Sequence, residues 1–219
     1  MTALDDTVTT AVPGTSIAQR VAALRATYRS GATRPLGWRR QQLEALVRML
    51  EENEGDFQAA LATDLGKPVA EGYLTDIAYV ISEAKMMLKN LKKWNKPQRV
   101  GTPLVAMPSK SRLVPEPLGV VLVIAPWNYP IQLLLVPVAG AIAAGNAVVM
   151  KPSEVSAATS AVLARLVPKH LDPSAISIVE GGVPETTELL EQHFDHIFYT
   201  GNGTVGRIVM SAAAKNLTP

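Results

Sequence analysis

The chain has 219 residues, of which 47% are hydrophobic and 18% are charged. This composition is typical of a globular protein with a buried core and excludes extensive disorder. The net charge of +2 is small and the Lys and Arg are scattered, so we expect no nucleic-acid partner. The sequence contains no cysteine, which excludes disulfides, thiolate metal sites and a cysteine nucleophile within it. Its three histidines lack metal-ligand spacing, so no metal site is expected.

The first part of the chain is predicted to be helical. Residues 1–15 are rich in Thr and Ala and are expected to form a flexible tail. They lack the order of a signal peptide, so we expect a cytoplasmic protein. Hydrophobic residues then recur at helical spacing, which makes residues 16–97 a helical region. The predicted helices cover residues 17–28, 43–50, 57–65 and 77–91.

Prolines interrupt the next segment, residues 98–117. Prolines 103, 108, 115 and 117 separate short apolar pieces there. Two of these pieces, residues 104–106 and 112–114, are expected to be extended. The pattern predicts a β excursion or an edge hairpin.

No charged residue occurs from Leu118 to Met150. Residues 120–124 form a continuous apolar run, which is typical of a strand that is covered on both faces. A membrane span over residues 131–150 is the alternative, because a span needs ~20 apolar residues. However, Gly145 and the following Asn146 form a helix stop inside this stretch. We therefore predict a buried helix at 131–144, a strand at 147–150, and no transmembrane span.

Helices and strands alternate through the rest of the chain. Further helices are predicted at 155–166, 185–192 and 204–214, and further strands at 176–179 and 196–199. Such alternation indicates an α/β fold in which crossover helices connect parallel strands. We predict N-terminal helices followed by an incomplete doubly wound parallel sheet, with a Rossmann-like core over residues 118–219.

Two polar motifs follow predicted strands, where parallel sheets bind their ligands. In the turn Pro126-Trp127-Asn128-Tyr129-Pro130, Asn128 is either an ordinary turn residue or an amide donor for a developing oxyanion. In Lys151-Pro152-Ser153-Glu154, Ser153 could cap the next helix, with Glu154 in its first turn. Alternatively, the ammonium and carboxylate of this motif could hold ribose hydroxyls.

A third motif, Gly201-Asn202-Gly203-Thr204-Val205-Gly206, matches G-x-G-x-x-G between a predicted strand and a helix. Backbone amides at such a helix start can bind phosphate. Only thirteen residues follow the motif, so no second strand supplies the usual acidic ribose partner. A glycine-rich turn without a ligand therefore remains an alternative.

Together these motifs, in this order and spacing, resemble those of the aldehyde dehydrogenase superfamily. Upstream segments such as Asp64-Leu65-Gly66-Lys67-Pro68 and Glu116-Pro117-Leu118-Gly119 resemble its class three branch, which acts on fatty, medium-chain and aromatic aldehydes. The resemblance covers residues 16–219. It implies oxidation of an aldehyde to a carboxylic acid with NAD or NADP as cofactor.

The resemblance also implies roles for individual residues. Asn128 would stabilise the oxyanion of the thiohemiacetal, and Lys151 with Glu154 would hold the adenosine ribose. Segment 98–117 would belong to the oligomerisation domain, so a homo-oligomer of the completed enzyme is expected. Further cofactor contacts are implied along the three motifs: Ala125, Pro126, Trp127, Ser153, Gly201, Asn202, Gly203, Thr204 and Gly206.

In the family, the strand with the general-base glutamate and the later nucleophilic cysteine follow the position of Pro219. We therefore expect an amino-terminal portion without the catalytic domain, inactive alone and able to bind a complementing C-terminal fragment. An unpaired sheet edge would favour association. The alternative is a non-catalytic nucleotide-binding half of a split or defunct enzyme.

Overall fold

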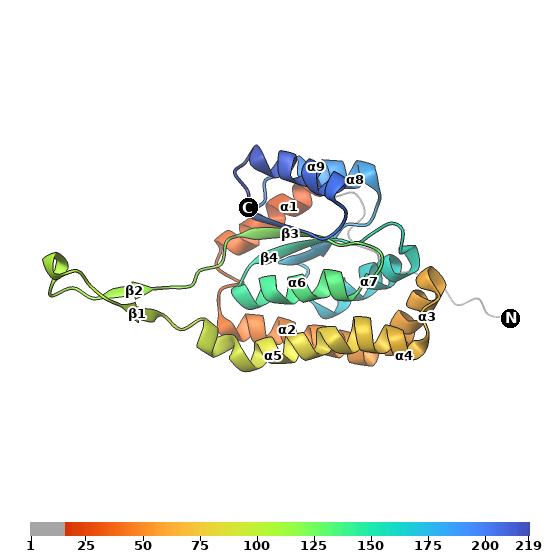
Figure 1. The fold of residues 1–219 in the computed structure, drawn as a ribbon, viewed down its shortest axis with the longest axis horizontal. Helices are drawn as coiled ribbons and strands as arrows, with labels where there is room; N and C mark the ends of the chain where they lie inside the picture. The colour runs from red at the N-terminus through yellow and green to blue at the C-terminus, as the bar shows by residue number, and fades with distance from the viewer. Residues whose placement is uncertain (1–15) are drawn as a thin grey trace.

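A computed structural model of the chain describes residues 16–219, so the tail expected at residues 1–15 lies outside the described residues. The predicted α/β fold is confirmed: helices come first, and a four-stranded parallel sheet with intervening helices follows (Figure 1). The N-terminal helices are α1 (Ile17–Arg29), α2 (Leu36–Glu52), α3 (Glu54–Leu65), α4 (Val69–Gly72) and α5 (Ala78–Trp94), with a π-helical turn η1 (Tyr73–Ile77) before α5.

The parallel sheet consists of β3 (Val120–Ile124), β4 (Ala147–Lys151), β5 (Ile176–Ile178) and β6 (His196–Tyr199). Its strand order is β5-β4-β3-β6. The chain therefore moves outward from β3 to β5 and then returns to add β6 on the other side of β3. Ile124 is in register with both Lys151 and Tyr199, so three strands end at the same level.

Helices cover both faces of the sheet (Figure 1). On one face lie α6 (Gln132–Ala144) and α7 (Ala157–His170), backed by α2, α3 and α5. On the other face lie α1, α8 (Val183–Leu190) and α9 (Gly203–Ala214). All residues of β3 and β4 are buried because their side chains point alternately into the two cores. Leu134 and Val148 belong to one core, and Val21 and Leu122 to the other.

The β excursion is a hairpin that extends away from the body of the molecule (Figure 1). Its strands, β1 (Gln98–Val100) and β2 (Ser111–Leu113), pair in antiparallel orientation. The expectation of an extended piece at residues 104–106 is wrong, because Leu104–Ala106 forms a 3₁₀ turn. This turn begins at Pro103, whose carbonyl accepts a hydrogen bond from Ala106 N at 2.9 Å. Leu104 and Val105 are almost completely exposed at this turn.

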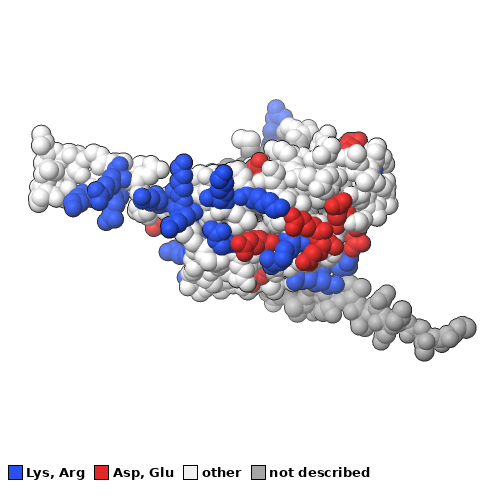
Figure 2. Space-filling model, turned by 90° about the horizontal axis from the view of Figure 1, so that it is seen from below, with Lys and Arg blue, Asp and Glu red and all other residues white. Residues whose placement is uncertain are grey.

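Many basic side chains gather at one end of the molecule, so the expectation that Lys and Arg are scattered is wrong for this part of the chain. Figure 2 shows that Lys and Arg gather along the hairpin and the adjoining part of the body, whereas Asp and Glu gather toward the opposite end of the same face. Between Lys85 and Arg112 the chain carries eight basic residues and no acidic one. Across residues 16–219, no helix combines the length and the apolarity needed to cross a bilayer.

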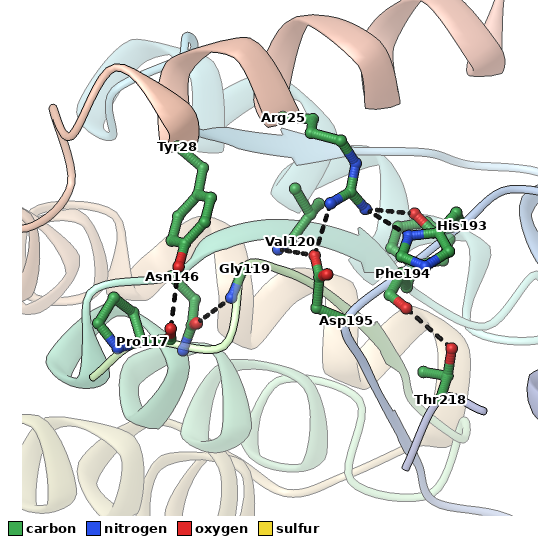
Figure 3. A network of polar contacts seen from close by, with 10 residues as sticks. All are labelled: Arg25, Tyr28, Pro117, Gly119, Val120, Asn146, His193, Phe194, Asp195 and Thr218. Atoms are coloured by element: carbon green, nitrogen blue, oxygen red, sulfur yellow. Dashed lines mark hydrogen bonds and ion pairs between the residues drawn. The ribbon is translucent and has the colours of Figure 1, made fainter. Parts of the chain in front are cut away.

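A polar network closes the amino end of β3 (Figure 3). The Asp195 carboxylate accepts hydrogen bonds from Arg25 Nη1 and Val120 N, both at 2.8 Å. Arg25 also donates to the His193 carbonyl oxygen at 2.6 Å. Gly119 has a φ of +150°, and a Cβ there would collide with the Asp195 carboxylate. The glycine is therefore required by the close approach of this side chain.

Three more hydrogen bonds belong to this network (Figure 3). Tyr28 donates from its hydroxyl to the Pro117 carbonyl at 2.9 Å, and Gly119 N donates to Asn146 Oδ1 at 2.9 Å. Thr218 Oγ1 donates to the Phe194 carbonyl at 2.8 Å. Because protein groups fill this end of β3, a ligand would bind at the opposite, carboxyl edge of the sheet.

Candidate functional site

The three polar motifs meet at the carboxyl edge of the parallel sheet. Ala125 N, just after β3, donates to the Lys151 carbonyl at 3.1 Å. Thr200 N, just after β6, donates to the Ile124 carbonyl at 3.0 Å. The structure thus brings together the segments that follow β3, β4 and β6, as expected for ligand-binding loops of an open parallel sheet.

The turn after β3 presents a polar side chain at its tip. Ala125 is buried and Pro126 is half-buried, whereas Trp127 is 50% exposed and Asn128 is exposed. The Tyr129 carbonyl accepts a hydrogen bond from Leu133 N at 2.9 Å, which leads the chain into α6. The Asn128 amide is therefore accessible next to the half-exposed Trp127 side chain, and an aromatic ring with a nearby amide can orient a planar ligand and its polar group.

Lys151 ends β4 with its ammonium group buried. Its side chain is only 2% exposed, and Nζ donates to the Pro152 carbonyl at 2.6 Å. Glu154 Oε2 lies 3.8 Å from Nζ and belongs to a half-exposed side chain. Burial lowers the pKa of Lys151, and Glu154, Glu185 and Glu180 oppose that shift. An ammonium has three N–H donors and the Pro152 carbonyl takes one of them, so Nζ retains donor capacity next to the half-exposed Glu154 carboxylate.

Two of these carboxylates were not predicted from the sequence. Glu180 comes two residues after β5 and accepts a hydrogen bond from Ser160 Oγ at 3.0 Å. Glu185 lies in the first turn of α8, where its carboxylate accepts a hydrogen bond from Gly182 N at 2.8 Å. An acidic residue followed by two glycines directly after a predicted strand, as at Glu180, was an available signal.

The expectation that Ser153 caps the next helix, with Glu154 in its first turn, is wrong. Ser153 Oγ instead accepts a hydrogen bond from Val155 N at 3.2 Å within a turn, and α7 begins only at Ala157. The cap comes from α3: the Asp64 carboxylate accepts hydrogen bonds from Ala158 N at 3.0 Å and from Thr159 N at 2.7 Å. Ser153 thus remains in the loop next to Lys151.

The glycine-rich turn after β6 leads into α9. Asn202 caps this helix, because its Oδ1 accepts a hydrogen bond from Val205 N at 3.0 Å. Gly203 and Thr204 are exposed, so the first backbone amides of α9 are accessible. Gly206 is half-buried against the Tyr199 ring, and its replacement by Ala would make an ordinary contact there.

Gly201 has a packing reason in addition to any ligand role. A Cβ at this position would collide with the Tyr199 hydroxyl, which donates to the Asn202 carbonyl at 3.1 Å. Burial raises the pKa of Tyr199, while this hydrogen bond opposes the shift. The phenol therefore stays protonated at neutral pH and keeps the turn closed over its own backbone.

The helices that follow the parallel strands differ at their N-termini, where the helix dipole and free amides favour anions. Asp76 accepts hydrogen bonds from the first amides of α6, Asp64 from those of α7, and Glu185 lies at the start of α8. In contrast, α9 is capped by the neutral Asn202 and has no acidic residue in its first turn. Among these helices, α9 is the one whose N-terminus can accept a phosphate without meeting a carboxylate.

The chain is similar to known proteins over almost its whole length. Aldehyde dehydrogenase family 3 member A2 of Macaca fascicularis is 50% identical over 201 residues, which are 92% of this chain and 41% of that protein. The solved structure of Staphylococcus aureus AldH in a substrate-bound state superimposes with a TM-score of 0.91 at 41% identity, over 94% of this chain and 45% of that one.

A variant of the P. syringae indole-3-acetaldehyde dehydrogenase AldA, solved in complex with NAD⁺ and IAA, has a TM-score of 0.80 at 25% identity, over 91% of this chain and 41% of that one. The chain thus spans less than half the length of these relatives. The family model described as "Aldehyde dehydrogenase family" matches residues 7–219, and the chain therefore belongs to the aldehyde dehydrogenase family.

Proposed function

We propose that this chain supplies the NAD(P)-binding part of an enzyme that oxidises an aldehyde to a carboxylic acid. The observation that carries the proposal is the N-terminus of α9, which has a neutral cap and accessible amides beside three carboxylate-capped helices. A dinucleotide pyrophosphate fits such a helix start. The NAD⁺ complex of the P. syringae relative supports the choice of cofactor.

The other residues of the carboxyl edge suit the remaining parts of the cofactor and substrate. Lys151 and Glu154 offer a donor and an acceptor 3.8 Å apart, which matches the hydroxyls of a ribose. Ala125, Pro126 and Trp127 provide an apolar wall for the cofactor, and the Ser153 and Thr204 hydroxyls offer further polar contacts. Asn128 donates from its amide to the oxygen of the aldehyde, where negative charge develops in the transition state.

The bound nicotinamide supplies the hydride acceptor, and the chain's own residues bind and orient it. Family chemistry also requires a thiolate nucleophile, and this sequence contains no cysteine. We infer that the thiolate and the general base belong to a further portion of the enzyme. The alternative, a nucleotide-binding half without catalysis, shares the same cofactor site. We also propose a cytoplasmic location, and oligomerisation of the completed enzyme through hairpin segment 98–117.

Titration of the 219-residue chain with NAD⁺ and NADP⁺ in a calorimeter tests the cofactor site. Lys151→Met retains most of the side-chain volume and removes the ammonium group. We expect this variant to bind the cofactor about 1–3 kcal/mol more weakly, the scale for a lost charge-assisted hydrogen bond. Lys89→Met, an exposed position on α5, is the matched control and should bind like the parent chain.

Equal affinity in the parent chain and in Lys151→Met would show that Lys151 does not contact the cofactor. Absence of binding to the parent chain, with its fold verified by circular dichroism, would contradict the proposed function itself. A chimera that carries the remaining length of the S. aureus relative separates the two hypotheses about chemistry. Aldehyde-dependent NADH formation by the chimera supports the dehydrogenase, and cofactor binding without turnover supports the non-catalytic alternative.

A further inference from the structure

A buried carboxylate lies directly beneath the turn that carries Asn128. Asp76, in the π-helical turn η1, has no exposed surface. Its Oδ1 accepts hydrogen bonds from Ile131 N and Gln132 N, each at 3.2 Å. Its Oδ2 accepts from Lys67 Nζ at 2.6 Å and from Thr75 Oγ1 at 3.4 Å. Both carboxylate oxygens are therefore engaged, and one of them holds the start of α6.

Lys67 connects this carboxylate to the turn itself. Its side chain is 8% exposed, and Nζ lies 4.0 Å from the centre of the Tyr129 ring. A cation over an aromatic face is attracted by the ring quadrupole, most strongly where water is excluded. Gly66 ends α3 in the left-handed conformation, with φ +64°, and Pro68 follows. The backbone on both sides of Lys67 is thus fixed, which directs its side chain to Asp76.

The Asn128 turn is consequently attached at both ends. Ala125 N is bound to the Lys151 carbonyl, and Tyr129 is held by the Lys67 ammonium. Only residues 126–128 lie between these two points. We propose that Asp76 and Lys67 are positioning residues: they hold turn 126–130, and with it the Asn128 amide, in the conformation that faces the cofactor and the aldehyde. The role of the turn toward cofactor and aldehyde rests on the proposed function, whereas the attachment of the turn by Asp76 and Lys67 does not.

Hydrogen exchange of the 219-residue chain without nucleotide tests the attachment. In Asp76→Asn, the loss of the charged acceptor should speed exchange at Ile131 and Gln132 by about tenfold or more. The matched control is Asp64→Asn, which removes the carboxylate cap of α7 instead. It should speed exchange at Thr159 and leave Ile131 and Gln132 as in the parent chain.

Two variants of Lys67 test its part in holding the turn. Lys67→Met removes the charge, whereas Lys67→Arg preserves a cation for both the Asp76 carboxylate and the Tyr129 ring. We expect faster exchange over residues 127–132 in Lys67→Met and recovery in Lys67→Arg. Equal exchange over residues 127–132 in Lys67→Met and Lys67→Arg would overturn the proposal, and so would equal acceleration at Thr159 and Ile131 in Asp76→Asn. In either case Asp76 and Lys67 would contribute only to the general stability of the fold.

The affinity for the cofactor then tests whether turn 126–130 faces the bound cofactor. If the turn faces the cofactor, NAD⁺ should bind several-fold more weakly to Asp76→Asn, in parallel with the local exchange. A loosened turn with unchanged NAD⁺ affinity overturns the positioning role of Asp76 and Lys67 toward the cofactor, while the proposed function stands if Lys151→Met still binds more weakly. If the parent chain does not bind NAD⁺ at all, the proposed function fails, and hydrogen exchange alone decides whether Asp76 and Lys67 hold the turn.

Discussion

Replacement of Asp195 by Ala should destabilise the fold and leave the carboxyl edge of the sheet intact. The substitution removes the acceptor of Val120 N, and because Val120 is completely buried, its N–H would have no partner. Such an orphaned group costs about 1–3 kcal/mol. The substitution also removes the ion pair with Arg25. Because the Arg25 and Asp195 side chains are only 19% and 24% exposed, this loss adds about 1 kcal/mol. Together we expect a loss of about 3 kcal/mol in the free energy of unfolding.

Urea denaturation followed by circular dichroism measures this loss. With a slope of roughly 2 kcal/mol per molar urea, the midpoint should fall by about 1.5 M. Asp195→Asn retains an acceptor for Val120 N and should lower the midpoint by only about 0.5 M. Glu44→Ala removes an exposed ion pair with Arg40 and should change stability by no more than about 0.5 kcal/mol.

A midpoint for Asp195→Ala that falls no further than that of Glu44→Ala, at an unchanged slope, would refute the expected loss of stability. Equal destabilisation by Asp195→Asn and Asp195→Ala would show that the unpaired Val120 N–H is not the main cause. NAD⁺ affinity should be equal in all three variants, since the network lies at the amino end of β3, opposite the proposed cofactor site.

Gly145→Ala should lower the free energy of unfolding by about 2–4 kcal/mol, because Gly145 has φ +92° and a Cβ would lie 2.6 Å from the Arg39 guanidinium carbon. Gly140→Ala in the same region, with no atom near its Cβ, should instead stabilise α6 by about 0.5–1 kcal/mol in the same assay. Burial lowers the pKa of Lys151 below its ordinary value of 10.5. Between the lowered pKa and 10.5, the unfolded chain therefore binds more protons than the folded chain. The stability of the parent chain relative to Lys151→Met should therefore rise as the pH increases from neutral toward 10.5, and a constant difference in thermal melts would contradict the burial effect. In the chimera, Asn128→Ala should lower kcat by ~10²–10³ with little change in cofactor affinity, because an oxyanion donor acts mainly in the transition state; full turnover would identify it as a turn residue. The 219-residue chain alone should form no NADH and should associate with rising concentration. Within the described sheet β6 pairs only with β3, its backbone otherwise donates one hydrogen bond from Ile197 N to the Pro219 carbonyl, and Phe198 is exposed. A monodisperse monomer in size-exclusion chromatography would refute the association.

The sequence predicts those elements whose signal is local. Residues 120–124 and 147–151 are strands covered on both faces, and their continuous apolar runs show this without any tertiary information. The apolar residues 104–106 between two prolines predict an extended segment, yet they form a 3₁₀ turn. Propensity for a strand is decided by neighbours on the sheet, and an exposed hairpin tip has none.

The residues that hold the candidate site are harder to predict, because their partners are distant in the sequence. A serine before a helix suggests a local cap, but α7 is capped by Asp64, which lies 94 residues before Ala158. Asp76 lies immediately before the apolar position Ile77, so periodicity alone does not identify it as a buried carboxylate. The π-helical turn that contains Asp76 also departs from the helical period on which such predictions rest.

The carboxylates that cap α6 and α7 have a consequence for how the chain folds. Asp64 bonds to residues 94 and 95 positions later in the chain, and Asp76 to residues 55 and 56 positions later. Closing such long loops is entropically unfavourable and slows folding. The first turns of α6 and α7 complete their hydrogen bonds only after α3 and η1 have docked. The helical region 16–97 and the core 118–219 should therefore form in one cooperative transition, and a chain that begins after residue 97 would start both crossover helices without their caps.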